Sequence, residues 1–105
     1  MKLFLLIYDV DFDEEIMETL AKCCVTGFTK WDRVLGKGAR SEPKMDNAVW
    51  PGFNCAVAIA LEEEKELTFK EALRETCTKL GEAGIKIYEL PIKEVDLVEC
   101  KASKI

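Results

Sequence analysis

The feature that most constrains the fold is an apolar run that begins almost at the N-terminus. Leu3 to Tyr8 contains no charged residue, and Asp9 and Asp11 end the run. A strand that is apolar on both faces belongs in the middle of a sheet, with other elements over each side. The run is too short to span a bilayer, which takes about 20 residues. We therefore expect a central strand over residues 2–10 and no insertion into a membrane.

Two later stretches carry the spacing of amphipathic helices. The first helix is expected over residues 12–25, where apolar residues recur at intervals of three and four behind an acidic first turn. The second is expected over residues 68–83, with the same spacing and with Gly84 as a stop. The acidic segment 62–66, just before it, is expected to form a solvated turn. Both helices then have one apolar side to pack against a sheet.

Three further stretches show the alternation of β-strands, over residues 29–35, 53–61 and 85–90. In the second of them, large apolar residues occupy one face, while Asn54 and alanines occupy the other. The elements therefore follow the order βαββαβ. Right-handed crossovers convert that order into a four-stranded antiparallel sheet with two helices on one face, the ferredoxin-like α+β sandwich.

Such a sheet has a second face that its own two helices do not cover. In this sequence that face is apolar, whichever side of the central strands is considered. An uncovered apolar face of this size predicts a partner, most simply other copies of the chain. We expect a homo-oligomer built from one ferredoxin-like domain over residues 1–92, followed by a C-terminal tail over residues 93–105.

The composition argues against several classes of function. The 105 residues include no histidine, which removes Ser–His–Asp and Cys–His catalysis and histidine-based zinc sites. The net charge of −5 argues against a nucleic-acid partner. The five cysteines are odd in number and irregularly spaced, so we expect free thiols and a cytoplasmic protein.

The stretch most suggestive of function runs from Gly36 to Gly52. It holds three glycines and two prolines, and it shows neither strand nor helix periodicity. Long loops of this kind in small domains tend to be functional. From Lys30 to Lys44 the chain carries five basic and two acidic residues, a net +3 in an otherwise acidic protein. A basic patch at this place suits a ligand with a phosphate or a carboxylate.

Within this region Gly36-Lys37-Gly38 is the strongest local feature. Glycines let backbone N–H groups approach an anion, while the lysine ammonium supplies charge. Trp50 can stack on an aromatic ligand or pack against a neighbouring subunit. The predicted ligand-binding residues are Arg33, Gly36, Lys37, Gly38, Arg40, Trp50, Asn54 and Lys86.

Two short stretches, Val34-Leu-Gly-Lys-Gly38 and Val49-Trp-Pro-Gly-Phe-Asn54, resemble the PII-like superfamily, the relatives of the nitrogen regulatory protein P-II. The likeness also rests on the element order and the long loop, and it spans about residues 1–92. It implies a homotrimer that binds a small anionic effector, often an adenine nucleotide, in the clefts between subunits. It also implies that the loop, residues 38–50, contacts a protein target. The loop contains no tyrosine, so the uridylylation known in P-II itself is not expected.

The resemblance favours a regulatory binding module with no resident cofactor and no metal. No nucleophile or acid–base pair stands out in the sequence, so we assign no catalytic residue and expect no enzyme. Two alternatives stay open at this point. One is a small ferredoxin-like enzyme that acts on an acidic substrate. The other is a metal-tolerance trimer of related architecture, in which Cys23 and Cys24 would bind the metal.

Overall fold

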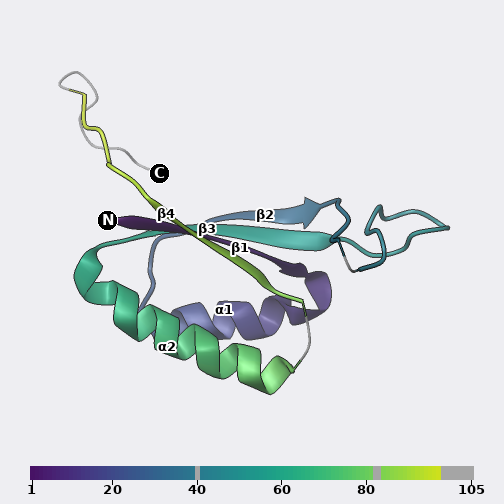
Figure 1. Cartoon of the computed structure of the whole chain (residues 1–105), viewed down its shortest axis with the longest axis horizontal. Coiled ribbons are helices and arrows are strands. Elements are labelled where there is room, and N and C mark those ends of the chain that lie inside the picture. The colour runs from purple at the N-terminus through teal and green to yellow at the C-terminus, as the bar shows by residue number, and fades with distance from the viewer. Residues whose placement is uncertain (40, 82–83, 98–105) are drawn as a thin grey trace.

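A computed structural model of the chain describes residues 1–39, 41–81 and 84–97, which form one sheet and two helices. Both helices lie against a single face of the sheet (Figure 1). This is the predicted ferredoxin-like α+β arrangement, with its elements in the predicted order. The elements are β1 (Lys2–Asp9), the 3₁₀ turn η1 (Val10–Phe12), α1 (Asp13–Lys22), β2 (Thr29–Val34), β3 (Asn54–Leu61), α2 (Glu63–Leu80) and β4 (Lys86–Pro91).

The strand β1 lies in the interior of the sheet, as its apolar run predicted. The strand order is β2-β3-β1-β4, and each pair of neighbours is antiparallel. β1 pairs with β3 on one side and with β4 on the other, so neither of its edges is free. Because side chains alternate along a strand, Phe4, Leu6 and Tyr8 all point towards the helices, where they are buried.

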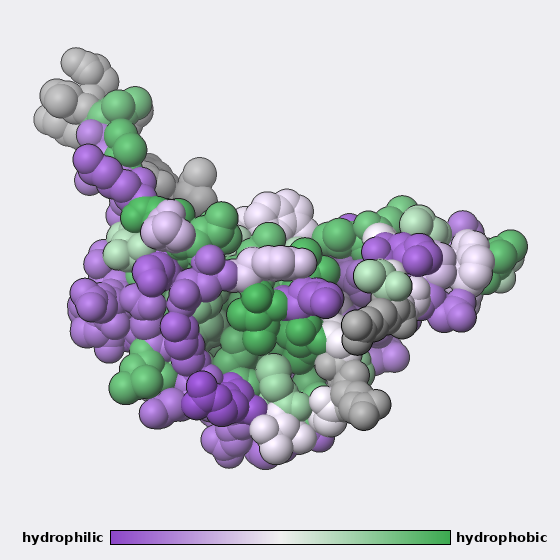
Figure 2. Space-filling view, in the orientation of Figure 1, coloured by the Kyte–Doolittle hydropathy of each residue, from purple (hydrophilic) through white to green (hydrophobic). Residues whose placement is uncertain are grey.

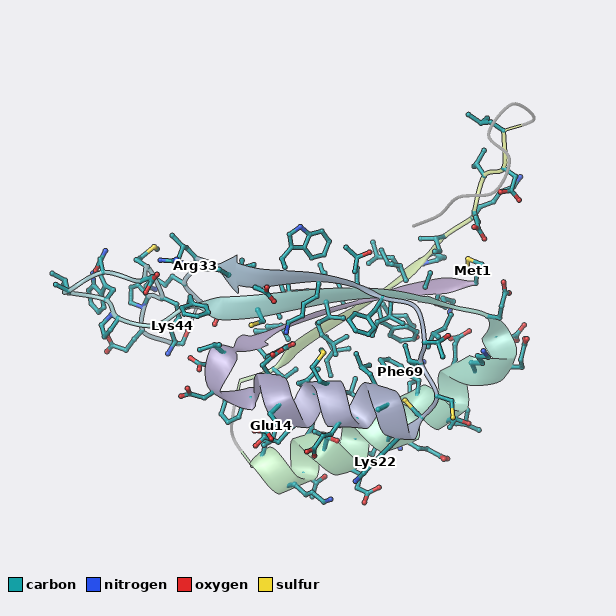
Figure 3. The ribbon with its side chains drawn as sticks, turned by 180° about the vertical axis from the view of Figure 1, so that it is seen from behind. Met1, Glu14, Lys22, Arg33, Lys44 and Phe69 are labelled. Atoms are coloured by element: carbon teal, nitrogen blue, oxygen red, sulfur yellow. The ribbon has the colours of Figure 1, made fainter. Side chains whose placement is uncertain are left out.

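The hydrophobic core lies between the sheet and the two helices. Phe4 of β1 and Phe69 of α2 are each 1% exposed, and the centroids of their rings are 4.9 Å apart. Ile16 and Leu20, which belong to the apolar stripe predicted for the first helix, are buried from α1. Figure 3 shows Phe69 in the space between the helices and the sheet. The periodicity of the sequence therefore identified the core-facing side of α1, whereas β1 is apolar on both faces and its run predicted only an interior strand.

The opposite face of the sheet has no helix over it in the described part of the chain (Figure 1), and we call it the open face. The register of the strands places the apolar residues of β1, the alanines of β3 and residues of both edge strands on this face. The side chains of Trp31 and Tyr88 are about half exposed, at 50% and 51%. The apolar residues of the open face are Leu3, Leu5, Ile7, Trp31, Ala56, Ala58, Ala60, Tyr88 and Leu90.

The helices begin at other residues than the sequence predicted. α2 begins at Glu63, so the acidic segment 62–66 forms the start of the helix instead of a solvated turn. Acidic side chains in a first turn are stabilised by the positive end of the helix dipole, although no side chain caps this helix. α1 is shorter than predicted, because η1 takes up its first residues and Cys24 adopts a φ of 59° beyond its end.

After β4 the chain leaves the sheet. The backbone N–H of Ile92 donates a hydrogen bond to the carbonyl of Met1, and residues 93–97 then extend away (Figure 1). Val95 and Leu97 are mostly exposed there. The tail predicted over residues 93–105 lies outside the described residues beyond position 97. Neither of the described helices has the length and apolar character needed to cross a bilayer.

The burial of Phe69 predicts how strongly the core depends on it. Phe69→Ala removes a ring that packs on Phe4 and is expected to lower the free energy of unfolding by about 3–5 kcal/mol. Leu67→Ala is the control, because Leu67 lies on the same helix and is 67% exposed; its effect should stay within about 0.5 kcal/mol. Urea unfolding at one fixed protein concentration measures both, and equal effects would contradict the core described above.

Candidate functional site

The loop that joins β2 to β3 (residues 35–53) projects beyond one end of the sheet (Figure 1). Its first half folds back on itself through an isolated bridge between Gly36 and Lys44. The N–H of Gly36 donates to the carbonyl of Lys44 over 2.9 Å, and the N–H of Lys44 donates back over 2.6 Å. These two bonds bring Lys44 to the base of the loop, although it lies midway along the loop sequence.

The second half of the loop is a hydrogen-bonded turn. The side-chain oxygen of Asn47 accepts hydrogen bonds from the backbone N–H groups of Val49 (3.1 Å) and Trp50 (2.7 Å). The N–H of Asp46, which has a φ of 51°, donates to the carbonyl of Gly52 over 2.9 Å. The described residues of the loop form neither strand nor helix, as the lack of periodicity predicted, and these hydrogen bonds hold its second half together.

Two ion pairs fasten the loop to the end of the sheet. The ammonium of Lys44 lies 2.8 Å from the carboxylate of Asp9, the last residue of β1. The guanidinium of Arg33, in β2, pairs with the carboxylate of Asp46 and lies 5.7 Å from the centre of the Phe53 ring. Figure 3 shows Arg33 and Lys44 at the same end of the sheet, where the loop starts. We call Asp9, Arg33, Lys44 and Asp46 the loop-base cluster.

The pKa values of the Asp9–Lys44 pair show that both groups are charged at neutral pH. Burial by itself would raise the pKa of Asp9, but the hydrogen bonds from the Lys44 ammonium and the Asp11 N–H outweigh it and hold that pKa below its usual value. The hydrogen bond to Asp9 in turn raises the pKa of Lys44. The pair is therefore a stable ionic contact between the loop and β1.

Gly52 lies beside the side chain of Lys44, where the chain enters β3. Its φ is +90°, a backbone conformation that residues with a side chain rarely adopt. A Cβ atom at this position would lie 3.6 Å from Cδ and 3.9 Å from Nζ of Lys44. The glycine is therefore required by the turn into β3, whereas a Cβ atom would make only ordinary contacts with the lysine side chain.

Three of the residues predicted to bind a ligand gather at the loop base. Arg33 belongs to the cluster described above, and Asn54 begins β3 opposite Asp9 on the open face. A Cβ atom at Gly36 would lie 3.9 Å from the amide nitrogen of Asn54. The structure therefore places Gly36 beside Asn54, and Arg33 at the same end of the sheet.

The structure places four of the other predicted residues elsewhere in the loop or on β4. The ammonium of Lys37 donates to the carbonyl of Gly38 over 3.4 Å, and the N–H of Gly38 donates to Ser41 Oγ over 3.1 Å, both within the loop. Trp50 belongs to the second turn of the loop. Lys86 projects from the open face on β4, with β1 between it and β3. The remaining predicted residue, Arg40, lies outside the described residues.

The sequence analysis did not assign Asp9, Lys44, Asp46 or Gly52 to the site. Lys44 was counted only as one of the charges of the basic segment, and Asp9 only as the residue that ends a strand. A regular spacing could not have revealed the contact between Asp9 and Lys44, because these residues are distant in the chain and meet only through the path of the loop. Gly52 offered a weak signal, since a Pro-Gly pair before a strand indicates a turn.

The basic segment is partly neutralised by carboxylates of the same chain. Lys30 points to the helix side of the sheet, where its ammonium lies 2.6 Å from Asp13 of α1 and 3.4 Å from Asp32. Arg33 and Lys44 are paired as described above. Of the four basic side chains of this segment that the structure describes, only Lys37 makes no ion pair.

Two hollows in the described surface lie away from the loop base. One, of about 440 Å³, lies between α2 and β4 over Phe4 and Phe69, and its apolar floor is visible in the middle of Figure 2. The other, of about 420 Å³, lies beside Met1 at the opposite end of β1 from the loop. Among the described residues no group of three or more cysteines and carboxylates is arranged to hold a metal ion. Neither of these two hollows includes a residue of the loop base, where Arg33, Gly36 and Asn54 lie.

The conformation of Gly52 predicts the cost of adding a side chain there. Gly52→Ala should lower the free energy of unfolding by about 1–2 kcal/mol, because the positive φ is strained for alanine. Gly27→Ala is the matched control, since no atom lies within 4 Å of its added Cβ and its φ is not positive. Denaturant unfolding of both variants checks this, and an equally small effect at the two positions would contradict the described turn.

The comparisons with known proteins agree on one fold. No protein-family model and no curated protein sequence matches this chain. Among solved structures, a protein of Thermus thermophilus assigned as PII-like in signalling is 19% identical, with a TM-score of 0.61 over 85% of this chain and 83% of that one. The PII-like protein CPII of Thiomonas intermedia, bound to ADP and bicarbonate, is 16% identical, with a TM-score of 0.63 over 85% of this chain and 84% of that one.

A second structure of CPII, bound to ADP, AMP and bicarbonate, is also similar, with a TM-score of 0.62 at 16% identity over 85% of this chain and 84% of that one. Each of these likenesses covers 85% of this chain. They confirm the fold that the resemblance implied. The chain has the ferredoxin-like fold of the PII-like signalling proteins.

Proposed function

We propose that this chain is a PII-like regulatory protein that binds a small anionic effector at its loop base and transmits its presence to a protein target. The observation that carries the proposal is the shared fold over 85% of the chain with CPII, whose structures hold ADP and bicarbonate. Both of these ligands are anionic. The effector is therefore proposed to be an adenine nucleotide, bicarbonate or both.

The open face of the sheet supports assembly into a homotrimer. Leu3, Leu5 and Ile7 line its centre, and the alanines of β3 leave a shallow strip into which larger side chains of another copy could pack. Burying such a face stabilises an assembly by roughly 25 cal/mol per Å² of apolar surface. Asn54 and Lys86 project from the same face and would then lie near the boundary between subunits.

Assembly would also complete the binding site. The loop base of one chain is an open surface, whereas small anions and nucleotides bind in concave sites that exclude much of the solvent. Lys37 is proposed to supply charge, and Gly36 and Gly38 to supply backbone N–H groups. Arg33, Arg40, Trp50, Asn54 and Lys86 are proposed to line the remainder of the cleft between neighbouring subunits.

Exposed apolar side chains at the far end of the loop support the proposal of a protein partner. Apolar surface lies at the end of the loop, on the right of Figure 2. Val49 is 73% exposed there, and Met45 and Trp50 are 37% and 38% exposed. Exposed apolar and aromatic side chains on a projecting segment are favoured at protein interfaces. Residues 38–50 are therefore proposed to contact the target, in the cytoplasm.

The pKa shifts support binding rather than catalysis. Burial raises the pKa values of the Cys23, Cys55 and Cys77 thiols, so that they stay protonated and weakly nucleophilic. Burial and a hydrogen bond to Asp13 raise the pKa of Tyr8 further above neutrality. A general acid or base works best with a pKa near the operating pH, whereas the shifts described here move these pKa values further above neutral pH. These shifts favour neither the enzyme nor the metal-tolerance alternative.

Isothermal titration calorimetry with ADP and with bicarbonate tests the proposal. The protein is expected to bind at least one of the two, and Lys37→Ala should weaken that binding about tenfold by removing a charge-assisted contact. Lys22→Ala, an exposed lysine at the end of α1, is the control and should bind like the wild type. The proposed function fails if the wild type binds neither ligand. Lys37 has no part in the site if its substitution changes nothing.

A further inference from the structure

The loop-base cluster contains carboxylates where an anionic effector is expected to bind. Asp9 holds the ammonium of Lys44, and Asp46 holds the guanidinium of Arg33. The carboxylates of these pairs are largely shielded from solvent, with side chains 18% and 28% exposed. In this state the two cations are neutralised by the chain itself. An arriving anion would meet a balanced pair of charges and not a free positive charge.

The Lys44–Asp9 contact also fixes the position of the loop. Lys44 joins the loop to β1 through its side chain and joins the two arms of the loop through its backbone bonds to Gly36. Its side chain runs closely past Gly52, where the chain enters β3. Any ligand that took the ammonium away from Asp9 would therefore disturb the side chain that holds the loop against the sheet.

We propose that Lys44 is an effector-binding residue and that Asp9 is its internal competitor, with Asp46 playing the same part for Arg33. The inference rests on the proposed function and assigns a regulatory device to that same site. In the effector-free protein, Asp9 and Asp46 occupy the cations and latch the loop to β1 and β2. The phosphate or carboxylate of the effector replaces them, and the loop is released towards its target.

The substitution Asp9→Asn separates the charge of Asp9 from its structural role. The side chain of Asp9 also accepts a hydrogen bond from the N–H of Asp11 over 2.9 Å and so caps η1. Asparagine can accept the same bond, since it is as good an N-cap as aspartate. The variant should therefore fold normally and lose only the negative charge that neutralises Lys44.

A double-mutant cycle with Lys44→Gln tests the competition directly. With ADP and with bicarbonate as the probes in calorimetry, Asp9→Asn is expected to bind about threefold to tenfold more tightly than the wild type. The gain should disappear when Lys44→Gln is also present, because the competitor then has no cation to occupy. Asp32→Asn is the matched control. It removes the same charge from an 86% exposed aspartate that pairs with Lys30.

The outcomes separate this inference from the proposed function. A gain in affinity over the wild type that depends on Lys44 supports the internal competitor. If the wild type binds neither probe, the proposed function fails, and the inference fails with it. If the wild type binds but Asp9→Asn gains nothing, the inference is overturned and the proposed function stands. The inference is also overturned if Asp9→Asn still raises the affinity when Lys44→Gln is present, or if Asp32→Asn raises it equally. Either result would indicate a general charge effect. If no variant binds either probe, both fail.

Amide hydrogen exchange tests whether the loop is released. The N–H groups of Gly36 and Lys44 are protected by their mutual hydrogen bonds, so their exchange reports on the attachment of the loop. Saturating ADP or bicarbonate, and separately the Asp9→Asn substitution, are expected to speed their exchange several-fold. Exchange that is unchanged in both cases would overturn the release of the loop.

Discussion

The whole arrangement depends on a sheet that carries helices on one face only. The alternation of β1 buries Phe4 and Leu6 under the helices and directs Leu3, Leu5 and Ile7 to the other face. Water in contact with that second apolar face is unfavourable, and the described part of the chain places no further element over it. This face is the basis for the proposed assembly, and the proposed sites belong to the boundary that neighbouring copies would create.

The loop base shows how the same sheet positions polar groups. Asp9 and Asn54 stand opposite each other where β1 ends and β3 begins, and this pairing sets the place at which the loop departs. The bridge at Gly36 then returns Lys44 to the sheet, close enough to pair with Asp9. A charge on a long loop thus becomes part of a fixed cluster. In the proposed device, this cluster responds to another anion because each of its cations is held by a single carboxylate.

The sequence predicted those elements whose hydrophobic pattern reflects which of their residues are buried. The interior place of β1 follows from its continuous apolar run, and the faces of β3 and the stripe of α1 follow from periodicity, because burial acts on neighbouring residues of one element. The start of α2 was missed because the charges at 62–66 resemble a solvated turn, although a helix dipole stabilises them equally well. The pairing of Arg33 with Asp46, and of Lys44 with Asp9, depends on the path of the loop, which periodicity does not describe.

The central claim is that copies of the chain cover the open face of the sheet. The state of assembly tests this claim most directly, since the proposed site depends on it. Sedimentation equilibrium of the purified chain at micromolar concentration measures its mass in solution without labels or ligands. The account predicts a species of three times the 11.9 kDa chain mass. A single species of 11.9 kDa would show that the open face stays exposed to water, and it would contradict the account.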